Sequence, residues 1–188
     1  MTMSGQPADK GLVILDRDGV INRDSSDFVK SPEEWIPLQG SIEAIAALSK
    51  AGFSVAVASN QSGLARGLFD AAALSAMHQK LHDLVASLGG RVTHIAICPH
   101  GPDDGCDCRK PKPGLLHQIG TALDADLAGV PFVGDSLRDL QAAQAAGARP
   151  ILVRSGNGQT TAESLPPDFS TIEIYDDLAA AVAALLLE

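Results

Sequence analysis

Two aspartates, Asp16 and Asp18, directly follow the apolar run at residues 12–15 and precede a glycine. A short apolar run that ends at a glycine-containing turn is typical of a buried strand. Because side chains alternate along a strand, both carboxylates are expected to emerge on the same side at its carboxyl end. Two such carboxylates repel each other unless a cation lies between them, and Mg²⁺, a hard cation, prefers oxygen ligands. The alternative is a polar strand end with Asp18–Gly19 as a turn.

Strand and helix patterns alternate along the rest of the chain. Predicted strands lie at residues 12–16, 53–58, 92–97, 130–133, 151–153 and 171–174. Predicted helices lie at residues 41–52, 70–88, 113–123, 137–146 and from 177 onward, with Ser41 and Asp70 as expected N-caps. Residues 19–40 show no clear periodicity and are interpreted as a long loop. This order predicts an α/β fold with a mostly parallel sheet flanked by helices and no internal domain boundary.

Polar residues follow the predicted strands at the edge where such sheets bind ligands. Ser59 and Asn60 follow the second strand, Lys110 comes from the loop after the third, and Asp135 follows the fourth. Each has a structural alternative: a turn for Ser59 and Asn60, a helix cap for Asp135, and a solvated charge for Lys110. Their joint arrangement at four strand ends favours a common site.

Hydrolysis of a phosphomonoester would use these residue types together, since it needs a nucleophile, a proton for the leaving oxygen and neutralisation of charge. Asp16 can be the nucleophile that forms an aspartyl-phosphate, and Asp18 the acid and then the base. Asp16, Asp135 and the chain at Asp18 can hold Mg²⁺. Ser59 can bind the phosphoryl group, and Lys110 can neutralise it.

The three cysteines of the chain fall within eleven residues together with a histidine. Cys98, His100, Cys106 and Cys108 make a complete tetrahedral set for Zn²⁺, and four protein ligands leave no open position, so a structural site is expected. An odd number of cysteines argues against a disulfide framework. The alternative is a group of reduced, unliganded thiols beside a histidine.

Residues 12–155 resemble the haloacid dehalogenase (HAD) superfamily of aspartate-nucleophile phosphatases. The resemblance is carried by Asp16-Arg17-Asp18-Gly19, Ser59-Asn60, Lys110 and Gly134-Asp135. Within it the chain is similar to the branch of histidinol-phosphate and D-glycero-D-manno-heptose-1,7-bisphosphate phosphatases. That resemblance implies a Rossmann-like core without a large cap, here a single domain over residues 1–188 with a zinc-binding loop at 98–108.

Residues 59–69 decide between the two substrates of that branch, because Asn-Gln-Ser-Gly and Ala-Arg-Gly-x-Phe resemble the heptose-bisphosphate phosphatases. The resemblance implies a Mg²⁺-dependent 7-phosphatase in nucleotide-activated heptose and lipopolysaccharide biosynthesis. Arg66 and Arg109 can bind the second phosphate of such a sugar. The alternatives are a histidinol-phosphate phosphatase and a non-catalytic module that binds a phosphorylated metabolite. Other candidate substrate contacts are Asp24, Ser25, Ser26, Asp27, Asn60, Gln61 and Ser62.

The length, composition and net charge of the chain limit the class of protein and the partners that are expected. A chain of 188 residues with 45% hydrophobic residues is typical of a globular protein with a sizeable core. The net charge of −9 argues against nucleic acid or an anionic membrane as a main partner. With no signal peptide or apolar segment long enough to span a bilayer, we expect a cytoplasmic, monomeric protein that acts on a phosphorylated sugar.

Overall fold

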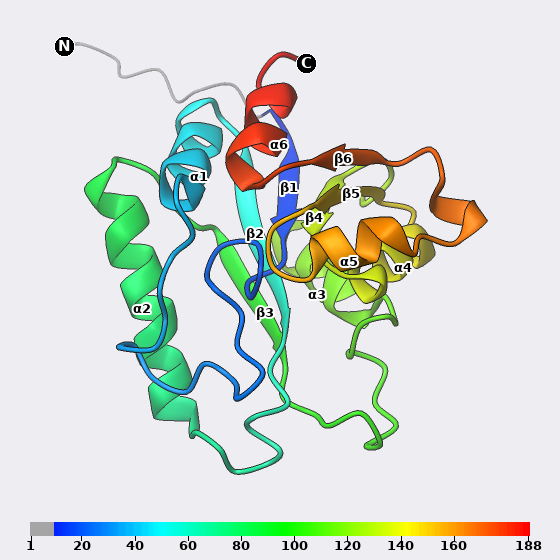
Figure 1. Cartoon of the computed structure of the whole chain (residues 1–188). Helices are drawn as coiled ribbons and strands as arrows, with labels where there is room; N and C mark the ends of the chain where they lie inside the picture. Colours follow the sequence, from blue (N-terminus) through cyan, green and yellow to red (C-terminus); the bar gives the residue numbers. More distant parts are fainter. Residues whose placement is uncertain (1–9) are drawn as a thin grey trace, which may run out of the picture.

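The computed structural model describes residues 10–188, so the first nine residues of the predicted domain lie outside the described part. Six strands form one sheet in the order β3-β2-β1-β4-β5-β6, and every neighbouring pair is parallel (Figure 1). The predicted α/β fold with a parallel sheet is confirmed. In chain order the strands are β1 (Leu12–Leu15), β2 (Ser54–Asn60), β3 (His94–Cys98), β4 (Pro131–Gly134), β5 (Arg149–Val153) and β6 (Glu173–Tyr175).

The helices cover both faces of this sheet (Figure 1). In chain order they are α1 (Ser41–Lys50), α2 (Ala71–Ser87), α3 (Gly114–Leu123), α4 (Leu137–Ala145), α5 (Gly158–Glu163) and α6 (Leu178–Leu185). The sequence did not predict α5 or the short 3-10 helix that follows it at Pro167–Phe169.

Alternation along β1 divides the core into two layers. Val13 and Leu15 pack in one cluster with the buried faces of α1, α2 and α6, whereas Leu12 and Ile14 pack in another with α3 and α4. All four side chains are buried. A strand that is apolar on both faces belongs in the middle of a parallel sheet, which is where β1 lies.

Strand β2 runs two residues further than predicted. Ser59 and Asn60 pair with Ile97 and Cys98 of β3, so they continue the parallel ladder, and the alternative of a turn at this point is wrong. Because Ser59 and Asn60 are polar, the hydrophobic pattern did not predict that the strand continues through them. Consequently the end of β2 and the end of β3 lie side by side, and each carries residues of a candidate site.

Of the two predicted N-caps, Asp70 is confirmed and Ser41 is wrong. The Asp70 side chain accepts a hydrogen bond from the Ala73 N–H at 2.8 Å, as an N-cap does. Ser41, predicted to cap α1, is instead its first residue, and the cap is Gly40 with a φ of 77°. The Ser41 hydroxyl donates to the Ile21 carbonyl at 2.7 Å. It therefore ties the long first loop to α1.

The loop at residues 19–40 is anchored to the core. Trp35 is fully buried, and Lys80 of α2 donates hydrogen bonds to the carbonyls of Pro32 at 2.6 Å and Trp35 at 2.8 Å. This loop and the loops that follow β2 and β3 gather at the carboxyl end of the sheet, in the lower part of Figure 1. The carboxyl end of the sheet is thus the place where distant segments of the chain meet.

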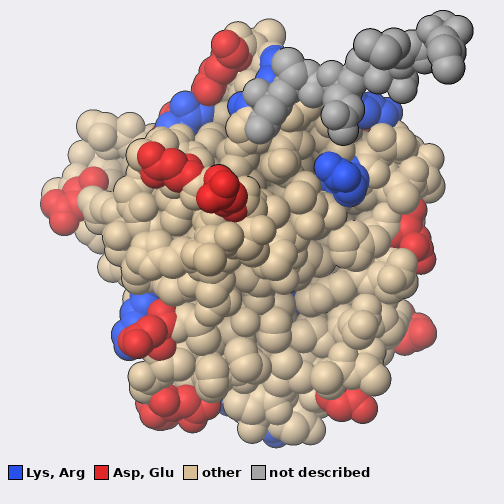
Figure 2. Space-filling model, turned by 180° about the vertical axis from the view of Figure 1, so that it is seen from behind, with Lys and Arg blue, Asp and Glu red and all other residues tan. Residues whose placement is uncertain are grey.

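On the face of the molecule seen in Figure 2, the charged side chains lie mostly toward the edge, around a centre without charged side chains. Within residues 10–188, no helix combines the length and the apolar character that crossing a membrane requires.

Candidate active site and cysteine cluster

Three carboxylates meet at the carboxyl end of the sheet. Asp16 follows β1, Asp135 follows β4, and Asp139 lies in the first turn of α4; oxygens of all three lie within 4.8 Å of one another. All three side chains are buried. The sequence predicted Asp16 and Asp135 here but missed Asp139, because its spacing from Ser136 signals only the capping box that the structure also contains.

Lys110 lies against this group. Its Nζ contacts Asp16 Oδ1 and Asp139 Oδ1, both at 2.7 Å. It also donates to the Ala58 carbonyl at 2.8 Å. Only 3% of Lys110 is exposed, so the alternative of a solvated charge is wrong. Burial acts to lower the pKa of Lys110, but the carboxylates of Asp139 and Asp16 raise it above its usual range, so this side chain stays cationic.

The crowding of carboxylates shifts their pKa values. Burial and then the Asp139 carboxylate raise the pKa of Asp135 to about 7. Burial and Asp139 likewise raise the pKa of Asp16 well above its usual value, although Lys110 opposes the shift. Three carboxylates and one ammonium group carry an excess of negative charge. A donor set of oxygens with this charge fits a divalent cation such as Mg²⁺.

Backbone segments at residues 19 and 156–157 lie against the carboxylate of Asp135. The Asn157 N–H donates to Asp135 Oδ2 at 2.8 Å, and a Cβ added at Gly19 or Gly156 would collide with that same oxygen. Both glycines also have positive φ values, 85° and 58°. The alternative of Asp135 as a helix cap is wrong, because Ser136 is the N-cap of α4.

The carboxylate of Asp18 faces a different set of partners. Arg17 donates to it from Nη2 at 2.9 Å and from Nε at 3.2 Å, Asn22 Nδ2 donates at 2.8 Å, and Gln61 Nε2 at 2.9 Å. Burial acts to raise the pKa of Asp18, but Arg17 and these hydrogen bonds lower it below its usual value. Arg17 itself is 1% exposed. No role was predicted for Arg17 from the sequence, because nothing in an Asp-x-Asp pattern distinguishes the middle residue.

A cavity of about 330 Å³ opens above these residues. It is of the size of small-ligand sites. Ser26 does not line it, and Asp27 lines a neighbouring depression instead. The sequence missed the lining residues Phe28, Arg138 and Asn157. The predicted residues that do line it are Asp16, Asp18, Asp24, Ser25, Asn60, Gln61, Ser62, Arg66, Arg109, Lys110 and Asp135.

Two residues at the end of β2, Ser59 and Asn60, form hydrogen bonds with other residues of the site. Ser59 is 1% exposed, does not line the cavity, and accepts a hydrogen bond from Gln61 Nε2 at 2.7 Å. Asn60 brackets the backbone of Lys110: its Nδ2 donates to the Lys110 carbonyl, and its Oδ1 accepts from the Lys110 N–H, both at 3.1 Å. Asn60 therefore holds the backbone of Lys110, the residue whose ammonium group enters the cavity.

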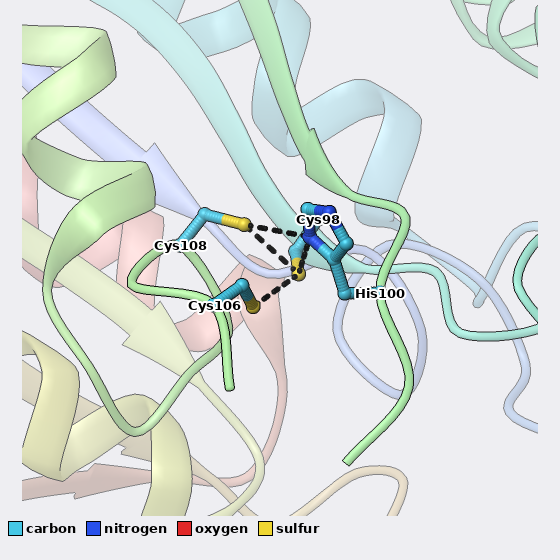
Figure 3. Close-up of side chains that lie close together, drawn as sticks. All are labelled: Cys98, His100, Cys106 and Cys108. Atoms are coloured by element: carbon cyan, nitrogen blue, oxygen red, sulfur yellow. Dashed lines mark hydrogen bonds between the residues drawn. The ribbon is translucent and has the colours of Figure 1, made fainter. Parts of the chain in front are cut away.

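The side chains of Cys98, His100, Cys106 and Cys108 point toward one another (Figure 3). The Cys98 sulfur lies 3.7 Å from the Cys106 sulfur and 3.1 Å from that of Cys108, and His100 Nδ1 lies 3.3 Å from Cys108. Zinc–sulfur bonds of about 2.3 Å would place tetrahedral sulfurs about 3.8 Å apart, so the four groups fit one Zn²⁺ with small adjustments.

The cysteine cluster is connected to Lys110 by one short segment. Cys98 ends β3 and belongs to the buried core, while Cys106 and Cys108 lie on the returning part of the loop. Arg109 Nη1 donates to the His100 carbonyl at 3.2 Å. The next residue is Lys110, so the closed loop determines where its side chain enters the cavity.

Known proteins are similar in sequence to nearly the whole chain. Residues 107–181 match the HAD-hydrolase-like family. The D-glycero-beta-D-manno-heptose-1,7-bisphosphate 7-phosphatase of Pseudomonas aeruginosa is 58% identical over 177 residues, which cover 94% of this chain and 98% of that protein. The enzyme of the same name from Bordetella bronchiseptica is 58% identical over 178 residues, with the same coverage of 94% and 98%. The chain belongs to the D-glycero-beta-D-manno-heptose-1,7-bisphosphate 7-phosphatase family.

Solved structures of this family have the same fold. The crystal structure of D,D-heptose 1,7-bisphosphate phosphatase from B. bronchiseptica, complexed with magnesium and phosphate, has a TM-score of 0.90 and 57% identity, covering 94% of this chain and 98% of that one. The corresponding phosphatase from Burkholderia thailandensis has a TM-score of 0.74 and 44% identity, with 95% and 100% coverage. The predicted membership of the HAD superfamily and of its heptose-bisphosphate branch is confirmed.

Proposed function

We propose that this phosphatase removes the 7-phosphate of D-glycero-D-manno-heptose 1,7-bisphosphate. The observation that carries the proposal is full-length identity of 58% to phosphatases of that name, combined with a cavity in which Asp16, Asp18 and Lys110 meet. Such a cavity combines a nucleophile, an acid and a fixed cation, which are the groups that phosphoryl transfer to a carboxylate needs.

The nucleophile is prepared by two donors on one of its oxygens. Asp16 Oδ1 accepts hydrogen bonds from the Arg17 N–H and from Lys110 Nζ, each at 2.7 Å. Among the residues that the structure describes, none donates to Oδ2, so this is the oxygen we assign to the attack on phosphorus. As it attacks, the bond from phosphorus to the 7-oxygen of the sugar breaks, and an aspartyl-phosphate forms.

Asp18 moves the protons of both half-reactions. It gives a proton to the leaving 7-oxygen, and as a carboxylate it then takes one from the water that attacks phosphorus and breaks the bond to Asp16. In the resting protein its partners keep the pKa of Asp18 low. The negative charge of a bound phosphoryl group opposes that effect, because a nearby like charge raises the pKa of a carboxyl group.

Two metal ions belong to this proposal. Mg²⁺ would be held by Asp16, Asp135 and Asp139 with a backbone carbonyl near Asp18, and when bound it offsets the charge of the phosphoryl group. Zn²⁺ would be held by the cysteine cluster, where four protein ligands make it structural.

The rest of the cavity would bind the sugar. Asp24 and Ser25 offer hydrogen-bonding groups to its hydroxyls, and Arg66 and Arg109 are candidates for its second phosphate. Because the whole proposed site comes from the described part of one chain, we propose that a monomer is active. Its place would be the cytoplasm, in nucleotide-activated heptose biosynthesis.

The substrate is tested by comparing two phosphate esters. We expect kcat/KM for heptose 1,7-bisphosphate to exceed that for histidinol phosphate by at least about a hundredfold, because a second phosphate held by arginine adds binding energy that can accelerate the reacting end. Phosphate release with Mg²⁺ measures the ratio, and ³¹P NMR should identify heptose 1-phosphate as the product. A preference for histidinol phosphate, or loss of the 1-phosphate, would contradict this assignment.

Mg²⁺ should stabilise the protein more at pH 8 than at pH 5.5. The pKa of Asp135 is raised from 3.8 to about 7 in the folded chain, so between these values the folded state keeps a proton that the unfolded state loses. This group therefore favours folding at low pH, and the advantage is lost as the pH rises to about 7. Mg²⁺ offsets the resulting repulsion, but at pH 5.5 it must first displace the proton.

Thermal melting of the zinc-loaded protein at both pH values, with and without Mg²⁺, checks this expectation. The control is Asp135→Asn, which has no proton to lose at that position and should show little pH dependence of the Mg²⁺ effect. Equal stabilisation of the unaltered protein by Mg²⁺ at both pH values would refute the expected link between Asp135 and the metal.

A further inference from the structure

A second cavity adjoins the active-site cavity on the side of the cysteine cluster. Four basic residues line it, Arg109, Lys110, Lys112 and Arg138, and its lining contains no acidic residue. Arg109, Lys110 and Arg138 line both cavities, so the two spaces meet at these side chains. In a chain of net charge −9, such a one-sided lining indicates a place for an anion.

The four cations differ in how many donors they have free. Lys110 is occupied by the catalytic carboxylates, and Lys112 pairs with Asp107 at 3.0 Å. Arg109 uses one nitrogen, Nη1, for the His100 carbonyl. Arg138 is exposed, and its side chain makes no hydrogen bond or ion pair with any residue from 10 to 188. Arg109 and Arg138 are therefore the pair with donors available to a ligand.

Arg66, the other candidate cation of the active-site cavity, lies in a different setting. Its guanidinium carbon is 5.5 Å from the centre of the Phe28 ring, in a cation–π contact with the first loop. Phe28 has a φ of 66°, which is uncommon for a residue other than glycine. Arg66 does not line the second cavity. Its position suits contact with the body of a substrate better than the capture of a remote anion.

We propose that Arg138 adds a second guanidinium group, beside that of Arg109, to the subsite where the phosphate that does not react binds, at the junction of the two cavities. The proposal rests on the proposed function, since it concerns the second phosphate of a sugar bisphosphate. Planar guanidinium groups bind phosphate through paired hydrogen bonds, so two of them can hold one end of the sugar while the other end reaches Asp16. Arg138 would thereby be a residue that determines specificity for bisphosphates.

The test compares substrates with and without the second phosphate. We expect Arg138→Gln to lower kcat/KM for heptose 1,7-bisphosphate by roughly 10- to 100-fold, the range for a charge-assisted hydrogen bond to a phosphate. The same variant should change kcat/KM for heptose 7-phosphate by less than about threefold, because that substrate has nothing to place in the subsite. Arg91→Gln, at an exposed arginine between α2 and β3, is the matched control and should leave both values unchanged.

A binding measurement separates this proposal from the proposed function. The inhibition constant of heptose 1-phosphate should rise in Arg138→Gln by the same factor as kcat/KM falls, while that of inorganic phosphate, which binds near Asp16, stays constant. If the unaltered protein does not hydrolyse heptose 1,7-bisphosphate but binds heptose 1-phosphate through Arg138, the proposed function fails and the subsite stands. If Arg138→Gln keeps the full preference for the bisphosphate, or if Arg66→Gln loses it instead, the subsite is wrong.

Discussion

Asp16→Asn is expected to abolish phosphate release, with a loss of on the order of 10⁴- to 10⁶-fold in kcat, as for the removal of other catalytic nucleophiles. An amide is a very poor nucleophile, and the substitution also removes one of the three carboxylates that would hold Mg²⁺. Steady-state phosphate release with heptose 1,7-bisphosphate measures the effect. The variant should fold, because asparagine has the same shape and because neutralising one member of a crowded carboxylate group relieves repulsion.

The control for this variant is Asp168→Asn, at an exposed aspartate in the short 3-10 helix. It should release phosphate as fast as the unaltered protein. Mass spectrometry after acid quenching should find one added phosphoryl group on the unaltered protein and none on Asp16→Asn. Turnover by Asp16→Asn at a rate close to that of the unaltered protein would rule out the covalent mechanism.

Cys106→Ser is expected to remove the zinc, which should be present at about one ion per chain in the unaltered protein, and to lower kcat by about a hundredfold. The size follows from the position of Lys110, since a displacement of about 1 Å in a catalytic group can cost about 10² in rate. Cys106 is at the cluster but outside the buried core, whereas Cys98 is fully buried within it. The loop should therefore lose its order while the sheet remains folded.

Metal analysis, phosphate release and thermal melting of Cys106→Ser give the three measurements. Asp103→Ser is the matched control, because Asp103 is exposed in the same loop and is not one of the four clustered groups. It should keep its zinc and its activity. Freshly purified, unaltered protein with full activity and no zinc would contradict the assignment of the cluster.

Several features of this protein follow from the sequence alone because they depend on neighbours in the chain. The apolar run before Asp16 predicts a buried strand, and β1 is one. Asp70 is the N-cap of α2 because its side chain reaches a backbone N–H three residues away. The four zinc-ligand candidates converge as expected because a loop of eleven residues joins them. Motif and resemblance together also predicted the family to which the chain belongs.

Only the tertiary structure decided how segments far apart in the chain combine. Lys110 Nζ contacts Asp16, which lies 94 positions away in the sequence. Asp139 of α4 also contacts Lys110, but in the sequence its position indicates only a capping box. Arg109 and Arg138, two of the three basic residues that line both cavities, come from the loop after β3 and from α4. The pattern of hydrophobic residues does not predict the distances between these side chains. They depend on how helices and loops pack over the carboxyl end of the sheet, and that packing depends on the whole core.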